Sequence, residues 1–218
     1  MEYVFGYGSL IYSLSRNRTT PDKNRIFPLK IYGLARGWWA VIPVPGPGTT
    51  FLGCVEAVRY GLKEDESFVN GVAYQVTPED LRLIDMREIG YTRIQVDLNN
   101  VQDYCNQFQP GDRVWVYTVE SQEKNFPKDH YPTAELPIVQ SYLDLCINGC
   151  LEIEKEFENT AGFCSDFISS TKHWSKFWVN DRIFPRRPFI HEPNAFLIDR
   201  ILAENEEVRQ FIQQRYIE

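Results

Sequence analysis

The feature that most constrains the fold of this chain is an apolar segment that runs into a glycine-spaced turn near the N-terminus. It reads Tyr3-Val4-Phe5-Gly6-Tyr7-Gly8-Ser9-Leu10. Val4 and Phe5 suit a buried strand, whereas Gly6 and Gly8 allow backbone angles and close approaches that a side chain would prevent. Because successive N–H groups in such a turn can converge on an anion, the segment predicts a strand that ends in a ligand-binding turn.

Three other interpretations compete for the same segment. A dinucleotide-binding fingerprint needs a third glycine three residues after the second, where this chain has Ile11. A nucleophile elbow needs Gly-x-Ser-x-Gly, whereas Ser9 lies in Tyr-Gly-Ser-Leu-Ile. These two are excluded, but a plain tight turn in which the glycines only relieve strain stays open.

Composition narrows the classes of protein to which the chain can belong. Its 218 residues, of which 43% are hydrophobic, can bury one substantial core with an appendage. The net charge of -7 argues against a general affinity for nucleic acid or for anionic membranes. No apolar stretch is long enough to cross a bilayer, and the first residues lack the pattern of a signal peptide. We therefore expect a cytoplasmic protein without a nucleic-acid or membrane partner.

Cysteine and histidine usage points away from disulfides and metals. The five cysteines form no Cys-x-x-Cys pair, and their odd number leaves one over in any complete pairing, so we expect reduced thiols. The three histidines are scattered without the spacing of metal ligands. No metal site is expected.

Apolar runs before residue 120 predict about six or seven strands and one main helix. Thr77 is a good N-cap and Pro78 suits the first helical position, so the helix should begin there and end near Glu88, before Gly90. The strands expected after the opening segment span residues 26–34, 38–44, 51–59, 69–76, 91–98 and 113–119, with Ala35-Arg36-Gly37 joining the first two. The pattern indicates an α+β fold built on a mixed, barrel-like sheet.

Beyond residue 120 the pattern becomes helical. Residues 121–133 are polar and interrupted by prolines, which predicts a surface connection. Apolar residues at helical spacing then predict a long helix over 136–158, followed by helices near 163–175 and 193–215. We therefore expect a catalytic core at residues 1–120 and, at 121–218, a linker with a C-terminal helical extension packed on that core.

Two segments taken together resemble the gamma-glutamylcyclotransferase superfamily, which includes AIG2-like and ChaC-like proteins. The first is Phe5-Gly6-Tyr7-Gly8-Ser9-Leu10. The second is Asp85-Met86-Arg87-Glu88-Ile89-Gly90-Tyr91, at the end of the helix that follows Gly71-Val72-Ala73-Tyr74. The match covers about the first half of the chain in order and spacing.

The resemblance implies an activity and a site. In the superfamily the Tyr-Gly-Ser turn holds the α-amino acid end of a γ-glutamyl group, and a glutamate acts as acid and base. The positions that match the turn are Tyr7, Gly8, Ser9 and Leu10. The glutamate matches Glu88, and Tyr91 with Arg93 fits the aromatic and basic residues that tend to follow it. The expected activity is release of 5-oxoproline from a small-molecule γ-glutamyl substrate.

The chemistry implied by this resemblance needs no cofactor. The α-amine of a γ-glutamyl substrate can itself attack the γ-carbonyl and expel an amine, so Ser9 is expected to assist binding only. One carboxylate can serve first as base and then as acid, and such catalysis typically contributes about 10²- to 10⁴-fold in rate. Glu88 suits this role if burial raises its pKa. The alternative is that Glu88 is a solvated residue at a helix end, and nearby Asp85 could pair with Arg82 or Arg87.

Several points stay open at this level. The rival from another class is a non-catalytic module that binds an acidic metabolite or a peptide end in the same turn. Tyr117 is a weaker candidate for a hydroxyl in the cavity. Residues 43–49 could form a lid. The arginine-rich segment 178–188 could cap the site, meet a charged leaving group, or simply form ion pairs that hold the helices to the core. The sequence does not identify the amine that the reaction would release, so glutathione and other γ-glutamyl compounds stay open as substrates. It does not fix the oligomeric state either.

Overall fold

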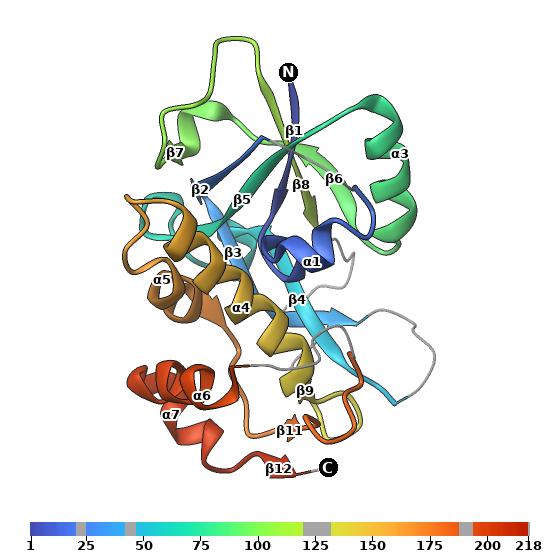
Figure 1. Cartoon of the computed structure of the whole chain (residues 1–218), viewed down its shortest axis with the longest axis vertical. Coiled ribbons are helices and arrows are strands. Elements are labelled where there is room, and N and C mark those ends of the chain that lie inside the picture. Colours follow the sequence, from blue (N-terminus) through green and yellow to red (C-terminus); the bar gives the residue numbers. More distant parts are fainter. Residues whose placement is uncertain (21–24, 42–46, 120–131, 188–193, 218) are drawn as a thin grey trace.

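A computed structural model describes residues 1–20, 25–41, 47–119, 132–187 and 194–217 (Figure 1). The predicted connection at 121–133 and the predicted lid at 43–49 lie largely outside these ranges. Within them, the strands form two six-stranded sheets and helices pack around them. None of the described helices combines the length and the apolar character needed to cross a membrane.

The first sheet is built around the N-terminal strand. Its strand order is β6-β8-β1-β5-β2-β7. β1 runs antiparallel to β5 and parallel to β8, and its residues from Tyr3 to Phe5 are fully buried. The bounds are β1 Glu2–Gly6, β2 Ile26–Tyr32, β5 Phe68–Val76, β6 Thr92–Gln95, β7 Val101–Asp103 and β8 Arg113–Thr118. This central position carries the glycine turn to the edge of a rigid core.

The second sheet joins early and late parts of the chain. Its strand order is β10-β3-β4-β9-β11-β12. β3 and β4 form an antiparallel hairpin. Two strands from beyond residue 132 extend it: β10 pairs in parallel with β3, and β9 pairs in parallel with β4. The bounds are β3 Leu34–Val41, β4 Thr50–Glu56, β9 Ile138–Val139, β10 Thr171–Lys172, β11 Trp178–Asn180 and β12 Tyr216–Ile217. The α+β class is confirmed, but in the described residues the strands lie in two sheets and not in one barrel-like sheet.

The helices differ in how deeply they pack. The long helix α4 crosses the front of the molecule, with most of its residues buried (Figure 1). Gly149 allows this close packing, because a Cβ there would lie 2.6 Å from the backbone nitrogen of Tyr12. The helices are α1 Ser13–Arg16, α2 Ala57–Tyr60, α3 Pro78–Arg87, α4 Gln140–Glu156, α5 Phe163–Ser170, α6 Ala195–Glu204 and α7 Glu206–Ile212, with 3-10 turns η1 Ser9–Ile11, η2 Glu64–Glu66 and η3 Leu98–Asn100.

The helix predicted after Thr77 is confirmed as α3. Thr77 and Asp80 form a reciprocal capping box, in which the Thr77 hydroxyl accepts from the Asp80 N–H at 3.2 Å. Pro78 occupies the first turn, and Glu88 is the C-cap residue. Gly90 then adopts a φ of +94°, a left-handed conformation that favours glycine. These local signals place Glu88 at the end of the helix.

The first two predicted strands are joined elsewhere than expected. The chain turns at Gly33, which has a φ of +78°, so Ala35, Arg36 and Gly37 lie inside β3 and do not form the connection. This turn needs a residue with a left-handed backbone conformation, which glycine adopts without strain. The predicted strand over 51–59 also ends early, because α2 begins at Ala57.

Pairing across the sheet changes the predicted C-terminal helices. The long helix begins at Gln140 and not at 136, because Ile138 and Val139 pair with β11. α5 ends at Ser170 because Thr171 pairs with Arg36. The helix expected over 193–215 is two helices, since Asn205 interrupts it and caps α7 through the Val208 N–H at 3.1 Å.

Candidate functional site

A cavity with an empty volume of about 360 Å³ opens at the end of β1. It is lined by Phe5, Gly6, Tyr7, Gly8, Ser9, Leu10, Leu52, Glu88, Tyr91, Tyr117 and Tyr142. The fold therefore brings all six residues expected in the site, Tyr7 to Leu10 with Glu88 and Tyr91, around one space. Their roles in binding and catalysis stay predictions.

The glycine turn is tightly folded where it meets the cavity. A Cβ on Gly6 would lie 2.6 Å from the Cβ of Leu10, so only glycine lets the chain return this closely. The Gly8 carbonyl then accepts from the Ile11 N–H at 3.0 Å, which starts the 3-10 turn η1. The N–H groups of Ser9 and Leu10 lie at the start of this turn, where N–H groups lack an acceptor within the helix.

Arg36 holds the turn from behind and was missed as a functional residue. It is fully buried in β3, and its guanidinium donates to the Tyr7 carbonyl at 3.0 Å. The same group donates to the Asn70 carbonyl and, on α5, to the Phe167 carbonyl, both at 2.8 Å. Burial lowers its pKa to about 10. The sequence signal was a charged residue inside an apolar strand, but no local pattern identifies its acceptors.

Glu88 is the carboxylate of this cavity. Its side chain is 17% exposed, and burial raises its pKa above the usual value. The Nε of Arg87 lies 3.5 Å from its carboxylate and partly opposes that shift. Arg87 is also bound elsewhere, since it donates to the Ser15 carbonyl at 3.1 Å and to the Thr19 hydroxyl at 2.7 Å. Glu88 therefore has a raised proton affinity, which is the direction of shift that favours a general base.

Tyrosine hydroxyls form much of the remaining wall. Tyr7 donates to the Tyr117 carbonyl at 2.7 Å, and Tyr91 donates to the Leu52 carbonyl at 3.1 Å. Burial raises the pKa of these phenols and of Tyr142 as well. The phenols therefore stay neutral at physiological pH, so they add no charge to the wall around Glu88.

Asp85 does not pair as the sequence suggested. Its carboxylate accepts from the Tyr117 hydroxyl at 2.6 Å and lies 3.2 Å from the Nη1 of Arg93. Arg82 instead pairs with Glu79, and Arg87 binds α1 groups as described above. The predicted pairing of Asp85 with Arg82 or Arg87 is therefore wrong. Asp85 fixes the hydroxyl of Tyr117 and leaves Glu88 as the carboxylate that faces the cavity.

Tyr142 is a lining residue that sequence reasoning did not identify. It comes from α4, and its hydroxyl lies 3.0 Å from the position that a Cβ on Gly8 would occupy. Its ring packs edge-to-face on Phe51, with ring centroids 5.1 Å apart. In the sequence, Tyr142 belongs to an apolar helical stripe, which is the pattern of any core residue. Only the tertiary fold distinguishes it.

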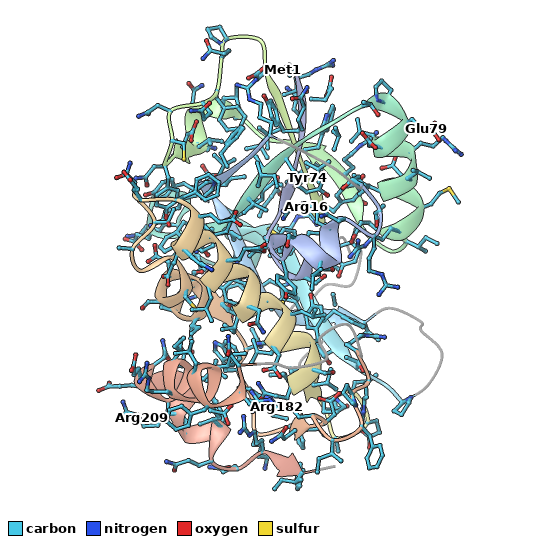
Figure 2. The ribbon with its side chains drawn as sticks, viewed as in Figure 1. Met1, Arg16, Tyr74, Glu79, Arg182 and Arg209 are labelled. Carbon is cyan, nitrogen blue, oxygen red and sulfur yellow. The ribbon has the colours of Figure 1, made fainter. Side chains whose placement is uncertain are left out.

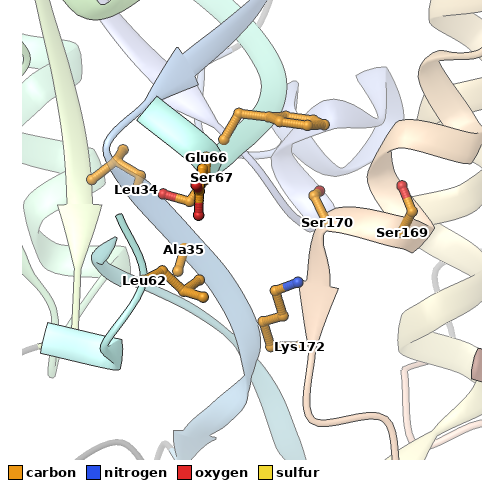
Figure 3. A pocket seen from close by; sticks show the side chains of 9 residues that line it. Leu34, Ala35, Leu62, Glu66, Ser67, Ser169, Ser170 and Lys172 are labelled. Atoms are coloured by element: carbon orange, nitrogen blue, oxygen red, sulfur yellow. The ribbon is translucent and has the colours of Figure 1, made fainter. Parts of the chain in front are cut away.

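A larger cavity lies elsewhere and has different chemistry. Its empty volume is about 520 Å³, and it lies between β3, η2 and the end of α5 (Figure 3). Its carboxylate belongs to Glu66, whose side chain is 61% exposed and pairs with Lys63. Figure 3 shows the Lys172 amino group directed into the space. Because its acid is solvated, this cavity lacks the feature that marks the smaller one.

Comparison with known proteins identifies the family. A model of the family described as ChaC-like protein matches residues 2–139, well over half of the chain. The chain belongs to this family, and the resemblance to the gamma-glutamylcyclotransferase superfamily is confirmed. No curated protein sequence matches it.

Solved structures share the fold at low sequence identity. One, described as gamma-glutamyl cyclotransferase, is 13% identical with a TM-score of 0.53, over 74% of this chain and 85% of that chain. Another is the uncharacterized protein loc79017 from Homo sapiens, which is 15% identical with a TM-score of 0.51 over the same shares. At such identities the likeness extends to the fold alone.

Proposed function

We propose that this protein is a gamma-glutamylcyclotransferase that releases 5-oxoproline from a small γ-glutamyl compound. The observation that carries the proposal is the Glu88 carboxylate, 17% exposed, which shares one cavity with the turn from Tyr7 to Leu10. Membership of the ChaC-like family supports it. A neighbour in fold that bears the name gamma-glutamyl cyclotransferase agrees with it.

The turn would bind the amino-acid end of the substrate. The N–H groups of Ser9 and Leu10 can donate to the α-carboxylate, since N–H groups at a helix start favour anions. Arg36 keeps this turn in position through the Tyr7 carbonyl. The α-amine would then lie close to the γ-carbonyl, and intramolecular reactions of this kind reach effective molarities of about 10⁵ to 10⁸ M.

Glu88 would transfer the proton. Its carboxylate takes a proton from the α-ammonium, and the free amine forms a bond to the γ-carbon. The bond from the γ-carbon to the leaving nitrogen then breaks as Glu88 returns the proton to that nitrogen. The ring nitrogen gives up a second proton, which the released amine takes up, so the products are 5-oxoproline and the amine as its ammonium ion, and atoms and charge balance. The raised pKa of Glu88 suits both steps, because a general base works best with a pKa near the operating pH.

The test compares Glu88→Gln with a matched control. Purified protein is incubated with γ-glutamyl amino acids, γ-glutamyl amines and glutathione, and 5-oxoproline is measured. Glu88→Gln should lower kcat by about 10²- to 10⁴-fold, because it removes the acid and base. Glu79→Gln should have wild-type kcat, because Glu79 lies on the outer side of α3 and pairs only with Arg82 in the described residues (Figure 2). Normal turnover by Glu88→Gln would contradict the mechanism.

The rival is a binding module with the same turn. It predicts that glutamate or 5-oxoproline binds to the wild type while no member of the panel is converted. Calorimetry with both compounds, run beside the turnover assay, separates the two functions. The identity of the leaving amine, with glutathione as the narrower possibility, follows from the kcat/KM values across the same panel.

A further inference from the structure

The arginines of segment 178–188 have different surroundings. Arg182 forms ion pairs, with its Nε 2.8 Å from Asp144 and its Nη1 2.9 Å from Asp199. Figure 2 shows it near the C-terminal helices. Asp181 is fully buried and accepts from the Ser141 hydroxyl at 2.6 Å and from the Arg186 N–H at 2.8 Å. For these residues the interpretation as structural contacts holds.

Arg187 is different, because its guanidinium has no acidic partner among the described residues. Its backbone N–H donates to the Ser141 hydroxyl at 3.0 Å, which fixes the residue at the start of α4. Its guanidinium carbon lies 4.6 Å from the centroid of the Phe51 ring. Within the described residues it forms no ion pair, and its buried Nε has no hydrogen-bond acceptor. Burial lowers its pKa, while Tyr142 and then Asp181 act to raise it.

This cation lies beside the candidate site. Phe51, on which it stacks, packs on Tyr142 and precedes Leu52 in β4. Both Tyr142 and Leu52 line the cavity that contains Glu88. A Cβ on Gly8, in the turn, would lie 3.0 Å from the hydroxyl of Tyr142. A substrate whose amino-acid end is held by the turn can therefore extend past Tyr142 toward Arg187.

We propose that Arg187 is a specificity-determining residue that binds a carboxylate on the leaving group of the substrate. The inference rests on the proposed function and names its substrate class: γ-glutamyl amino acids and peptides with a free carboxylate, in preference to γ-glutamyl amines. A partly desolvated guanidinium without an anion is costly, and a carboxylate matches its fork of donors in charge and geometry.

The experiment uses a pair of substrates that differ in one charge. γ-Glutamyl-alanine and γ-glutamyl-alanine amide have the same size, but only the first has a carboxylate on its leaving group. The wild type should have the higher kcat/KM on the acid. Arg187→Gln should lower kcat/KM on the acid by about 10- to 100-fold, as expected for loss of a charged hydrogen bond, and should leave the value on the amide nearly unchanged.

Two further variants refine the test. Arg187→Lys keeps the charge without the fork and should retain part of the preference. Arg186→Gln removes a neighbouring charge that donates to the Gly48 carbonyl, and it should keep the full preference. Should Arg187→Gln fail to fold, Arg187→Lys decides, and a preference equal to that of the wild type would then overturn the proposal.

The outcomes separate this inference from the function on which it rests. A wild type that releases 5-oxoproline from both substrates without preference, or an Arg187→Gln variant that loses equally on both, overturns the role of Arg187 alone. A wild type that releases no 5-oxoproline from any member of the panel overturns both proposals, and one that is active on the panel but on neither alanine substrate overturns the role of Arg187 alone.

Discussion

Two cavities in the described part of the chain, one around Glu88 and one beside β3, differ in how they treat charge. The one beside β3 is larger, at about 520 Å³ against about 360 Å³, yet the side chain of its Glu66 is 61% exposed and pairs with Lys63. In the smaller cavity the Glu88 side chain is only 17% exposed and has tyrosines around it. Desolvation of an acid, and not volume, is what raises a pKa toward the range useful for catalysis.

Arg36 lies between the two cavities and contacts residues of both. Its guanidinium donates to the Tyr7 carbonyl, in the wall of the smaller cavity, at 3.0 Å. On the other side it donates at 2.8 Å to the hydroxyl of Ser170, which lines the larger one. The variants below test whether the two cavities differ in function as their charges indicate, beginning with this shared residue.

The largest effect is expected for Arg36→Met. The substitution would leave several buried oxygens without a donor, among them the carbonyls of Tyr7, Asn70 and Phe167. Each stranded group costs roughly 1 to 3 kcal/mol, so the free energy of unfolding should fall by at least about 3 kcal/mol. Urea denaturation measures the fall. Arg36→Lys should lose less, and a midpoint for Arg36→Met equal to that of the wild type would contradict the role of Arg36.

A smaller and more local effect is expected for Gly8→Ala. The new Cβ would lie 3.0 Å from the hydroxyl of Tyr142, so the Tyr142 side chain, which lines the cavity, would have to shift by a few tenths of an ångström. We expect kcat/KM to fall by about tenfold or more with little change in stability, because misplacement by about 1 Å can cost 10²-fold.

A glycine outside both cavities serves as the control for Gly8→Ala. Gly61 has a φ of +81° with no atom within 4 Å of its added Cβ. Gly61→Ala should therefore lose about 1 to 2 kcal/mol of stability through strain while its turnover stays normal. If Gly8→Ala has normal turnover, the glycine turn is not part of the site.

The parts of the site that sequence analysis identified are those with local signals. The turn at Gly6 to Gly8 needs glycine, and the Thr77 cap with Gly90 places Glu88 at the end of α3. These features depend on residues only a few positions apart. Short-range chemistry therefore predicted the turn and the helix, whereas the choice of Glu88 as the candidate carboxylate came from the family resemblance.

The missed parts depend on contacts between distant segments. Tyr142 and Arg36 take their roles from packing across more than a hundred residues, as in the bond from Arg36 Nε to the Thr171 hydroxyl. β9 and β10 are only two residues long, and pairing rather than propensity makes them strands. Helical periodicity alone therefore placed the ends of α4 and α5 incorrectly.

The pH dependence of stability is expected to distinguish Glu88 from a solvated acid. Its folded-state pKa is raised, so the stability linked to its proton is present at low pH and is lost as pH rises through that pKa. The Glu88→Gln variant has no carboxyl at this position to titrate, so it does not lose stability in this way as pH rises. The free energy of unfolding of the variant, minus that of the wild type, should therefore increase between about pH 4 and about pH 8. Paired urea titrations at the two pH values measure it, and a constant difference would mean that Glu88 is not desolvated.

The smallest effect is expected for Lys172→Gln, in the larger cavity. Lys172 supplies the amino group directed into that space (Figure 3), and it has no place in the wall around Glu88. Its removal should leave kcat/KM for 5-oxoproline release within about twofold of the wild type, since surface substitutions away from a site change little. A loss of tenfold or more, with an unchanged urea midpoint, would mean that the larger cavity contributes to turnover. The desolvated acid would then no longer distinguish the two cavities, because a cavity whose acid is solvated would also contribute to 5-oxoproline release.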